Sequence, residues 1–275
     1  MDSPVVSVRA KSLGGARDLD WEELTDVIDL LLWSGKLLLE HGASAPRVEA
    51  TVYRLGTGLG VDDLDILVSP NVIVITTSEG HEFRTKARRI AHVGVNLSAI
   101  VAVSDLVRAV IAGRIGRSGV RRQLATIAAA APAYPRWLVV LMVGVACGAF
   151  GRIFGADWAG FGATVVAAAA AMAVRQQLAL RRFNPGLVVL ATALAASGLC
   201  GLLLRLLPSA APQHALAACV LLLVPGVPLI NAVEELVRGH AIIALGRTAV
   251  AVLVTFAAAL GLMLGMELTG LGGLL

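Results

Sequence analysis

The amino-acid sequence predicts an α-helical polytopic membrane protein, with about five transmembrane helices behind an N-terminal soluble α+β domain. The chain is 57% hydrophobic and 15% charged, with a mean hydropathy of +0.80, whereas soluble domains average roughly 45–50% apolar and about 25% charged residues. The charges are also unevenly placed: residues 1–135 hold 15 Lys/Arg and 15 Asp/Glu, and residues 136–275 hold 8 and 4. An ordinary soluble enzyme, a disordered protein and a nucleic-acid binder all fit these figures poorly.

The net charge of +4 belongs to the second half, because the first half is neutral. Basic residues beside membrane spans follow from the positive-inside tendency. We therefore expect the partner of this basic half to be the lipid bilayer and not nucleic acid. The first twenty residues contain no apolar core long enough for a cleavable signal, so the N-terminus is expected in the cytoplasm.

Residues 1–19 are polar and read as a flexible tail, and residues 20–135 as a cytoplasmic α+β domain. Asp20 and Glu23 fit a capping arrangement for a helix whose apolar residues recur at helical spacing through Glu40. Gly42 fits the C′ position that ends this helix. Ser44 and Pro46 then predict the start of a second helix, closed by Gly58 and Gly60.

The next segment is rich in β-branched residues and contains a Glu79-Gly80 turn, which predicts strands near residues 64–69, 71–77 and 82–86. The helical period returns at Ile90 and continues to Ile111. A shorter helix is expected over residues 117–131, before Pro132 and Pro135.

Residues 136–275 form the predicted transmembrane domain. Apolar runs of 17–20 residues cover about 26–30 Å, the thickness of a bilayer core. Lys and Arg are abundant in alternate connecting segments, which places the soluble half inside and the C-terminus outside. Three GxxxG spacings favour close helix packing over chance occurrence; they are Gly144/Gly148, Gly151/Gly155 and Gly261/Gly265. The expected spans are about 137–154, 158–174, 185–204, 213–230 and 248–266.

The fourth span is interrupted by the sequence VPGVP. Pro225 and Pro228 each lack an amide donor, and Gly226 relaxes the backbone between them. Unpaired backbone groups at membrane depth require burial in protein or a water-filled cavity, and broken helices of this kind form substrate sites in transporters. The simpler alternative is a proline kink that ends a helix, followed by a solvated acidic turn. We favour the functional interpretation.

Polar residues near the ends of the spans are the remaining candidates. Arg175 is more simply explained by snorkelling to the headgroups, although a guanidinium also offers a bidentate clamp for a carboxylate. The predicted substrate-binding set is Arg175, Gln176, Asn184, Pro225, Gly226, Pro228 and Asn231. The predicted coupling or gating set is Glu234, Glu235 and Gly239, because desolvation favours the protonated form of a carboxylate.

Enzymatic chemistry is not indicated. The five histidines never pair at i, i+4, and the sequence contains no HExxH, GxSxG or P-loop motif. The three cysteines lie in apolar runs and read as small buried hydrophobes. No catalytic residue, metal site or cofactor is therefore predicted.

Two stretches of the soluble half are also patterned, HGASAPRVE (41–49) and SPNVIVITT (69–77). The first is explained by a helix–Gly–helix corner and the second by a strand. A contact of either with a membrane loop, which it would gate, is the alternative.

These stretches, together with YPRWLVVLMVG (134–144), AMAVRQQLA (171–179) and LLLVPGVPLINAVEELVRGH (221–240), resemble the threonine/serine exporter (ThrE) family. The likeness is closest to the subunit type of two-component succinate exporters. It implies a multi-pass protein of the cell inner membrane that exports a small carboxylate, most simply succinate. It also implies a separate small membrane partner subunit of the YjjB type in a hetero-oligomer. Export of threonine or serine and a non-transporting regulatory role are the alternatives.

Overall fold

The computed structural model describes residues 21–274 apart from 62, 80–81, 92–93 and 131–133. The expected tail, the Asp20 cap, the Gly80 turn position and Pro132 lie outside the described residues. The described chain is mainly helical with one small sheet, and it divides into two compact units. Unit 1 comprises residues 1–131 and 227–248, and unit 2 comprises residues 132–226 and 249–275. The predicted fold class is confirmed.

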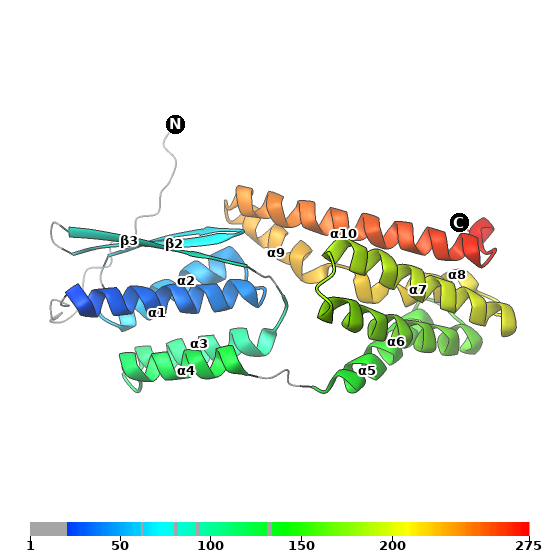
Figure 1. Ribbon diagram of the computed structural model, residues 1–275, viewed down its shortest axis with the longest axis horizontal. Coiled ribbons are helices and arrows are strands. Elements are labelled where there is room, and N and C mark those ends of the chain that lie inside the picture. The colour runs from blue at the N-terminus through cyan, green and yellow to red at the C-terminus, as the bar shows by residue number, and fades with distance from the viewer. Residues whose placement is uncertain (1–20, 62, 80–81, 92–93, 131–133, 275) are drawn as a thin grey trace. The chain divides into compact units, whose positions relative to one another are not determined.

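Unit 1 is built around α1 (Trp21–Glu40), which contacts the sheet and also α3 (Leu97–Ile111) and α4 (Arg117–Ala129). Figure 1 shows α1 between these layers. This position explains why the run Leu30, Leu31 and Leu32 is buried all round, instead of forming one apolar stripe. α2 (Ala45–Gly58) packs beside α1 and against α3.

The sheet is an antiparallel meander in the order β1 (Leu64–Ser69), β2 (Val72–Glu79) and β3 (Glu82–Arg89). Pairing of Leu64 with Thr77 and of Val72 with Arg89 sets the register. Ile73 and Ile75 alternate along β2 and are fully buried against the helices. The predicted strands are therefore present, with β3 extending three residues further than expected.

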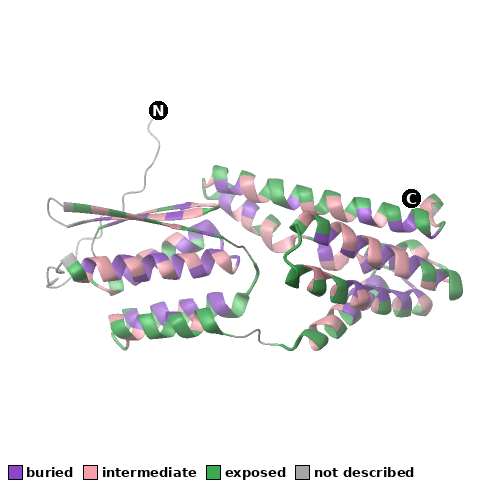
Figure 2. Cartoon of the chain, in the orientation of Figure 1, coloured by how far each residue is buried: buried purple, intermediate pink, exposed green. Residues whose placement is uncertain are grey.

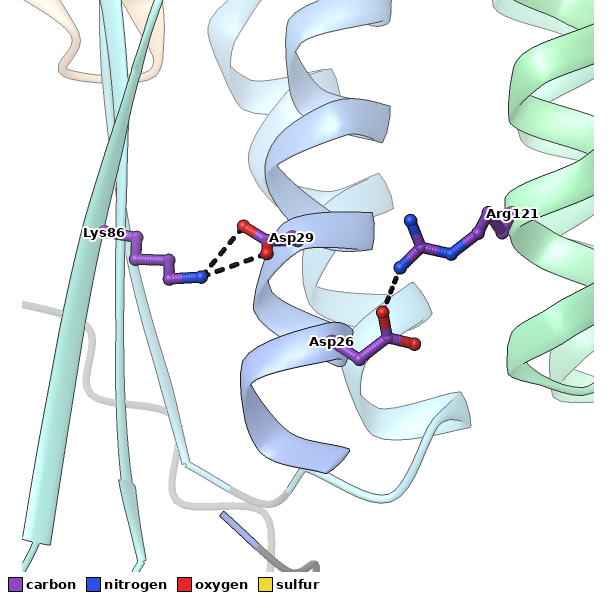
Figure 3. Close-up of polar contacts among 4 residues, drawn as sticks. All are labelled: Asp26, Asp29, Lys86 and Arg121. Carbon is purple, nitrogen blue, oxygen red and sulfur yellow. Dashed lines mark hydrogen bonds and ion pairs between the residues drawn. The ribbon is translucent and has the colours of Figure 1, made fainter. Parts of the chain in front are cut away.

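Ion pairs fix α1 to its neighbours on both sides (Figure 3). Lys86 Nζ on β3 lies 3.0 Å from both carboxylate oxygens of Asp29, and Arg121 on α4 pairs with Asp26. These pairs are partly exposed, so each contributes roughly 0–1 kcal/mol and serves mainly to orient the layers.

The expectation of a helix from Ile90 is wrong. The amide of Ile90 donates to the Asn71 carbonyl at 2.8 Å, which continues the sheet edge beyond β3. The helix begins at Leu97, where Asn96 caps it by accepting from the Ala99 amide at 3.2 Å. Apolar residues at helical spacing thus extended the predicted helix into a connecting segment.

Unit 2 contains the long apolar helices α5 (Arg136–Ile153), α6 (Trp158–Leu180) and α7 (Pro185–Leu206), which contact one another in sequence, and α8 (Pro212–Cys219), which packs against all three. α6 runs six residues beyond the predicted span because the polar sequence after Val174 remains helical. Four described helices are long and apolar enough to cross a membrane, or five if one bent pair is a single span. The fourth is α10 (Ala241–Leu268).

Small residues bring these helices close together. A Cβ on Gly261 of α10 would lie 2.6 Å from both the Leu190 carbonyl oxygen and Ala193 Cβ of α7, and one on Gly144 would lie 2.6 Å from the Val165 carbonyl oxygen. The GxxxG prediction is confirmed at these positions. Gly155 is different, because it follows α5 with a φ of +99° and serves a turn. Figure 2 colours much of α10 as exposed. The exposed residues include the large apolar Val252, Leu253 and Phe256, as expected of a surface that faces lipid.

Candidate functional site

The interruption at VPGVP is present. α8 is followed by the short 3₁₀ helix η1 (Leu221–Leu223), and after Val224 and Pro225 the chain resumes as α9 (Gly226–Val237), bent by 65° from the preceding helix. Pro228 lies in the first turn of α9, where an amide would have no intrahelical partner in any case. The two prolines therefore define the end of one helical segment and the start of the next.

Arg175 contacts the interruption. Its Nη1 donates to the Leu222 carbonyl at 3.2 Å, so a backbone acceptor released by the break is paired with a cation. Gln176 and Asn184 serve other helix ends: Gln176 Nε2 donates to the Arg136 carbonyl at 3.3 Å, and Asn184 caps α7 by accepting from the Gly186 amide at 2.9 Å. Of these three predicted residues of unit 2, Arg175 is thus the one that hydrogen-bonds to the break within the described part of the chain.

The polar residues of α9 lie in unit 1, where they meet the corner between α1 and α2. Ser44 occupies the N-cap position of α2 but makes no side-chain capping bond. Instead, the amide of Ala45 donates to Oε1 of Glu235 at 3.0 Å. A carboxylate from 190 residues further along the chain therefore caps α2, at the end where the helix dipole favours negative charge.

The same corner is held at its carbonyl groups. Asn231 Nδ2 donates to the Gly42 carbonyl at 2.8 Å, and Arg247 Nη2 at the start of α10 donates to the Ala43 carbonyl at 2.9 Å. Gly42 adopts a φ of +90°, as its predicted C′ position requires. Three side chains of residues 227–248 therefore satisfy backbone groups of a four-residue corner, which we call the corner lock (Asn231, Glu235 and Arg247 on Gly42, Ala43 and Ala45).

A buried ion pair lies at the centre of the corner lock. Arg247 Nε is 2.9 Å from Glu235 Oε1, and the two side chains are 14% and 0% exposed. Glu235 Oε2 is buried without a hydrogen-bond partner among the described residues. Such a pair costs desolvation to form, and loss of one partner leaves an uncompensated buried charge. The pair therefore makes the fit between the two segments specific.

A cavity of about 430 Å³ opens beside the corner lock. We call it the α9 cavity. Its charged and amide groups are Arg47, Asn231, Glu234 and Arg238. Glu234 also pairs with Arg238 at 3.3 Å one turn along α9, which leaves Arg47 as the excess positive charge. The remaining lining residues are Gly42, Ala43, Ser44, Pro46, Ala50, Leu97, Ile100, Val227 and Ile230.

Gly239 lies in the turn after α9, and its φ of +86° reverses the chain towards α10. The following His240 lies 3.5 Å from the carboxylate of Glu49 on α2. Burial raises the pKa of the Glu49 carboxyl above its ordinary value, and the nearby imidazole partly offsets that rise. This pair extends the contact between α2 and the loop after α9.

The two patterned stretches of the soluble half both contact residues 227–248. The 41–49 stretch forms the corner, and Pro70 of the 69–77 stretch lies in the turn between β1 and β2, where its Cγ would be 3.3 Å from a Cβ on Gly246. Ile243 is buried in the same apolar core as α1. The predicted corner and strand are both present, and in addition both stretches contact residues 227–248 of the same unit.

Arg47 and Arg247 were missed as site residues, because each had a sufficient explanation as a helix or juxtamembrane cation. The available signal was that the sequence contains both the 41–49 stretch, whose corner has backbone groups that need partners, and the 221–240 stretch, which is rich in polar side chains. The sequence does not show that these two stretches contact each other.

The composition and the long apolar helices define a multi-pass membrane protein. A family model described as "Putative threonine/serine exporter" (ThrE) matches residues 29–269, and the chain belongs to this family.

The chain is similar to two curated proteins named "Probable succinate transporter subunit YjjP". It is 38% identical to the protein of Escherichia coli (strain K12) over 253 residues, and 37% identical to that of Klebsiella aerogenes over 255 residues. Each comparison covers 92% of this chain and 98% of the relative. An uncharacterized protein of Haemophilus influenzae is 33% identical over 129 residues, which cover 47% of this chain and 43% of that protein. No solved structure matches.

Proposed function

We propose that this chain is a subunit of an inner-membrane exporter of small carboxylates, with succinate as the first substrate to test. The observation that carries the proposal is the likeness to two proteins named "Probable succinate transporter subunit YjjP" over nearly the whole length of each. The interrupted segment with Arg175 on its free carbonyl supports it. The name "subunit" of these relatives supports a partner, for which we propose a small YjjB-type membrane protein.

The proposed substrate site is the interruption itself. Arg175 has five N–H donors, and one of them is used on the Leu222 carbonyl, so others remain for a carboxylate. Five residues further along the chain, Val227 begins the lining of the α9 cavity, where Arg47 supplies the excess positive charge that attracts an anion. Of the predicted set, we propose Arg175 at the break in unit 2 and, separately, Asn231 at the α9 cavity of unit 1 as substrate contacts.

The proposed coupling residue is Glu235. Its Oε1 accepts from the Ala45 amide and pairs with Arg247 at the corner lock, so a change at this side chain acts directly on the start of α2. Loss of that pair would release the start of α2 from α9. Such a release would change the contact between α2 and α9 within unit 1. In the same movement, Gly239 would serve as the hinge and Glu234 would be the more exposed of the two carboxylates.

Uptake of labelled succinate into inverted membrane vesicles that contain both subunits tests the proposal. Arg175→Ala is expected to lower the initial rate at least about 10-fold, because a charge-assisted bond contributes roughly 1.5–3 kcal/mol. Arg181→Ala is the matched control, since this exposed arginine lies one residue beyond α6 and its rate is expected to be normal. Normal transport by Arg175→Ala would remove the arginine from the site.

Export of threonine or serine is the second candidate, and one observation favours it. The α9 cavity holds the carboxylate of Glu234 beside Arg47 and Arg238, which would suit the ammonium and carboxylate groups of an amino acid. Competition of unlabelled threonine and serine against labelled succinate separates the two substrates. Transport by the partner without this chain would favour the regulatory alternative.

A further inference from the structure

A second cavity of about 370 Å³ lies in unit 1 between α2 and α3, and we call it the α2–α3 cavity. Its charged lining residues are Arg47 and Arg54 of α2 and Arg108 of α3, with no Asp or Glu among the described lining residues. Arg47 lines this cavity and also the α9 cavity. Arg54 and Arg108 do not line the α9 cavity, so the α2–α3 cavity has a cationic set of its own.

The two arginines of α2 are seven residues apart and therefore share one helix face about 10.5 Å apart along the axis. Neither has an ion-pair partner among the described residues. Arg108 pairs with Asp105 on its own helix, so that its charge is partly compensated. Two uncompensated cations thus stand at separate points along one wall of the cavity.

The surface between these cations is apolar with hydroxyl groups at intervals. Ala50, Val101, Val107 and Ile111 supply the apolar contacts. Thr51 and Ser104 line the cavity with hydroxyls that donate to carbonyls of their own helices, at 2.7 and 2.8 Å. The cavity therefore combines cationic groups towards its ends with a mainly apolar middle.

We infer that the α2–α3 cavity is a binding site for a small aliphatic anion that carries a carboxylate at each end. Arg47 and Arg54 bind the two carboxylates, and the apolar wall contacts the methylene groups between them. Because Arg47 also borders the α9 cavity beside the corner lock, an occupant here changes the charge balance next to α9. The inference goes beyond the proposed transport function, since it concerns a second cavity of unit 1 that shares Arg47 with the α9 cavity but has Arg54 and Arg108 of its own.

Equilibrium binding of labelled succinate to the purified full chain in nanodiscs of neutral lipid tests this site. The measurement is made in an Arg175→Ala background, which removes the proposed contact at the interruption. We expect saturable binding that weakens about 10-fold in Arg54→Gln, because Arg54 is absent from the lining of the α9 cavity. Arg122→Gln on α4, an exposed arginine outside this cavity, is the matched control and is expected to leave the Kd unchanged.

Two ligand controls complete the experiment. Succinamide, which has the same length without charge, is expected not to compete, and acetate is expected to compete at least 10-fold more weakly than succinate. Equal affinity in Arg54→Gln and Arg122→Gln, or the absence of saturable binding, would overturn the inference. If the cavity instead binds only the phosphate of an anionic lipid, no free succinate will bind in neutral nanodiscs, and this result would also overturn the inference. Transport is not measured, so failure here is distinct from failure of the proposed function.

Discussion

The adjacent carboxylates Glu234 and Glu235 should differ sharply in their contribution to stability. Glu235 is fully buried, pairs with Arg247 and accepts from the amide of Ala45. Glu234 is 38% exposed and pairs with Arg238, which is 61% exposed, in an i, i+4 arrangement on the surface of α9. Substitution of each by glutamine removes one negative charge and leaves the size of the side chain unchanged.

The expected magnitudes follow from burial. Breaking a buried ion pair by loss of one partner costs about 3–5 kcal/mol, and the lower end applies to Glu235→Gln because the amide oxygen still accepts from Ala45. An exposed i, i+4 pair contributes roughly 0.3–0.5 kcal/mol. With about 2–4 °C per kcal/mol for a unit of this size, Glu235→Gln should lower the Tm by roughly 6–12 °C and Glu234→Gln by about 1–2 °C.

The assay is thermal unfolding of the purified full chain in one detergent, followed by far-ultraviolet circular dichroism. A double variant, Glu235→Leu with Arg247→Met, removes the unpaired buried charge but also the partners of the Ala45 amide and the Ala43 carbonyl, and should therefore recover only part of the lost stability. Equal losses for the two glutamine variants would refute the reasoning, because burial would then not distinguish the carboxylates. A double variant less stable than either single substitution would also contradict it.

Three further predictions concern packing, protonation and surface charge. Gly261→Ala should lower the Tm by several degrees through overpacking against α7, whereas Gly162→Ala, whose added methyl meets open space, should be neutral or slightly stabilising in the same melting assay. Burial raises the folded-state pKa of Glu49, so its stabilising contribution is complete below its ordinary value of 4.5 and is lost as pH rises through the raised pKa. Glu49→Gln should therefore show a smaller fall in Tm between pH 4.5 and 7 than the unsubstituted chain, and an equal fall would contradict the prediction. Asp26→Asn removes the partly exposed pair with Arg121 and should cost less than about 1 kcal/mol in chemical denaturation.

Much of the fold was predictable because the relevant signals are local. Hydropathy and helical period located the long helices, and the glycines at 42 and 60 marked turns that the structure confirms with positive φ values. The period misled at Ile90, where an apolar residue belongs to the sheet edge and not to α3. A local sequence pattern indicates whether a residue prefers a buried or an exposed position, but it does not indicate which helix or strand it packs against.

The corner lock could not be predicted for the same reason. The sequence places Glu235 in the coupling or gating set, but nothing in it indicates that the amide of Ala45, 190 residues earlier, is its partner. Arg247 reads as a juxtamembrane cation until the Ala43 carbonyl and Glu235 are seen as its partners. The sequence division at residue 136 also separates residues 227–248 from the soluble domain, whereas the compact unit includes them. Contacts between segments so far apart depend on the tertiary fold and leave no spacing rule in the chain.

Substrate exchange in proteoliposomes tests the central functional claim most directly. Vesicles loaded with unlabelled succinate and containing this chain together with the small partner subunit should accumulate labelled succinate transiently. Vesicles with either subunit alone should not. Unlabelled threonine or serine should not suppress the accumulation. Accumulation that requires only the partner, or that responds to the amino acids and not to succinate, would contradict the account of this chain as a subunit of a carboxylate exporter.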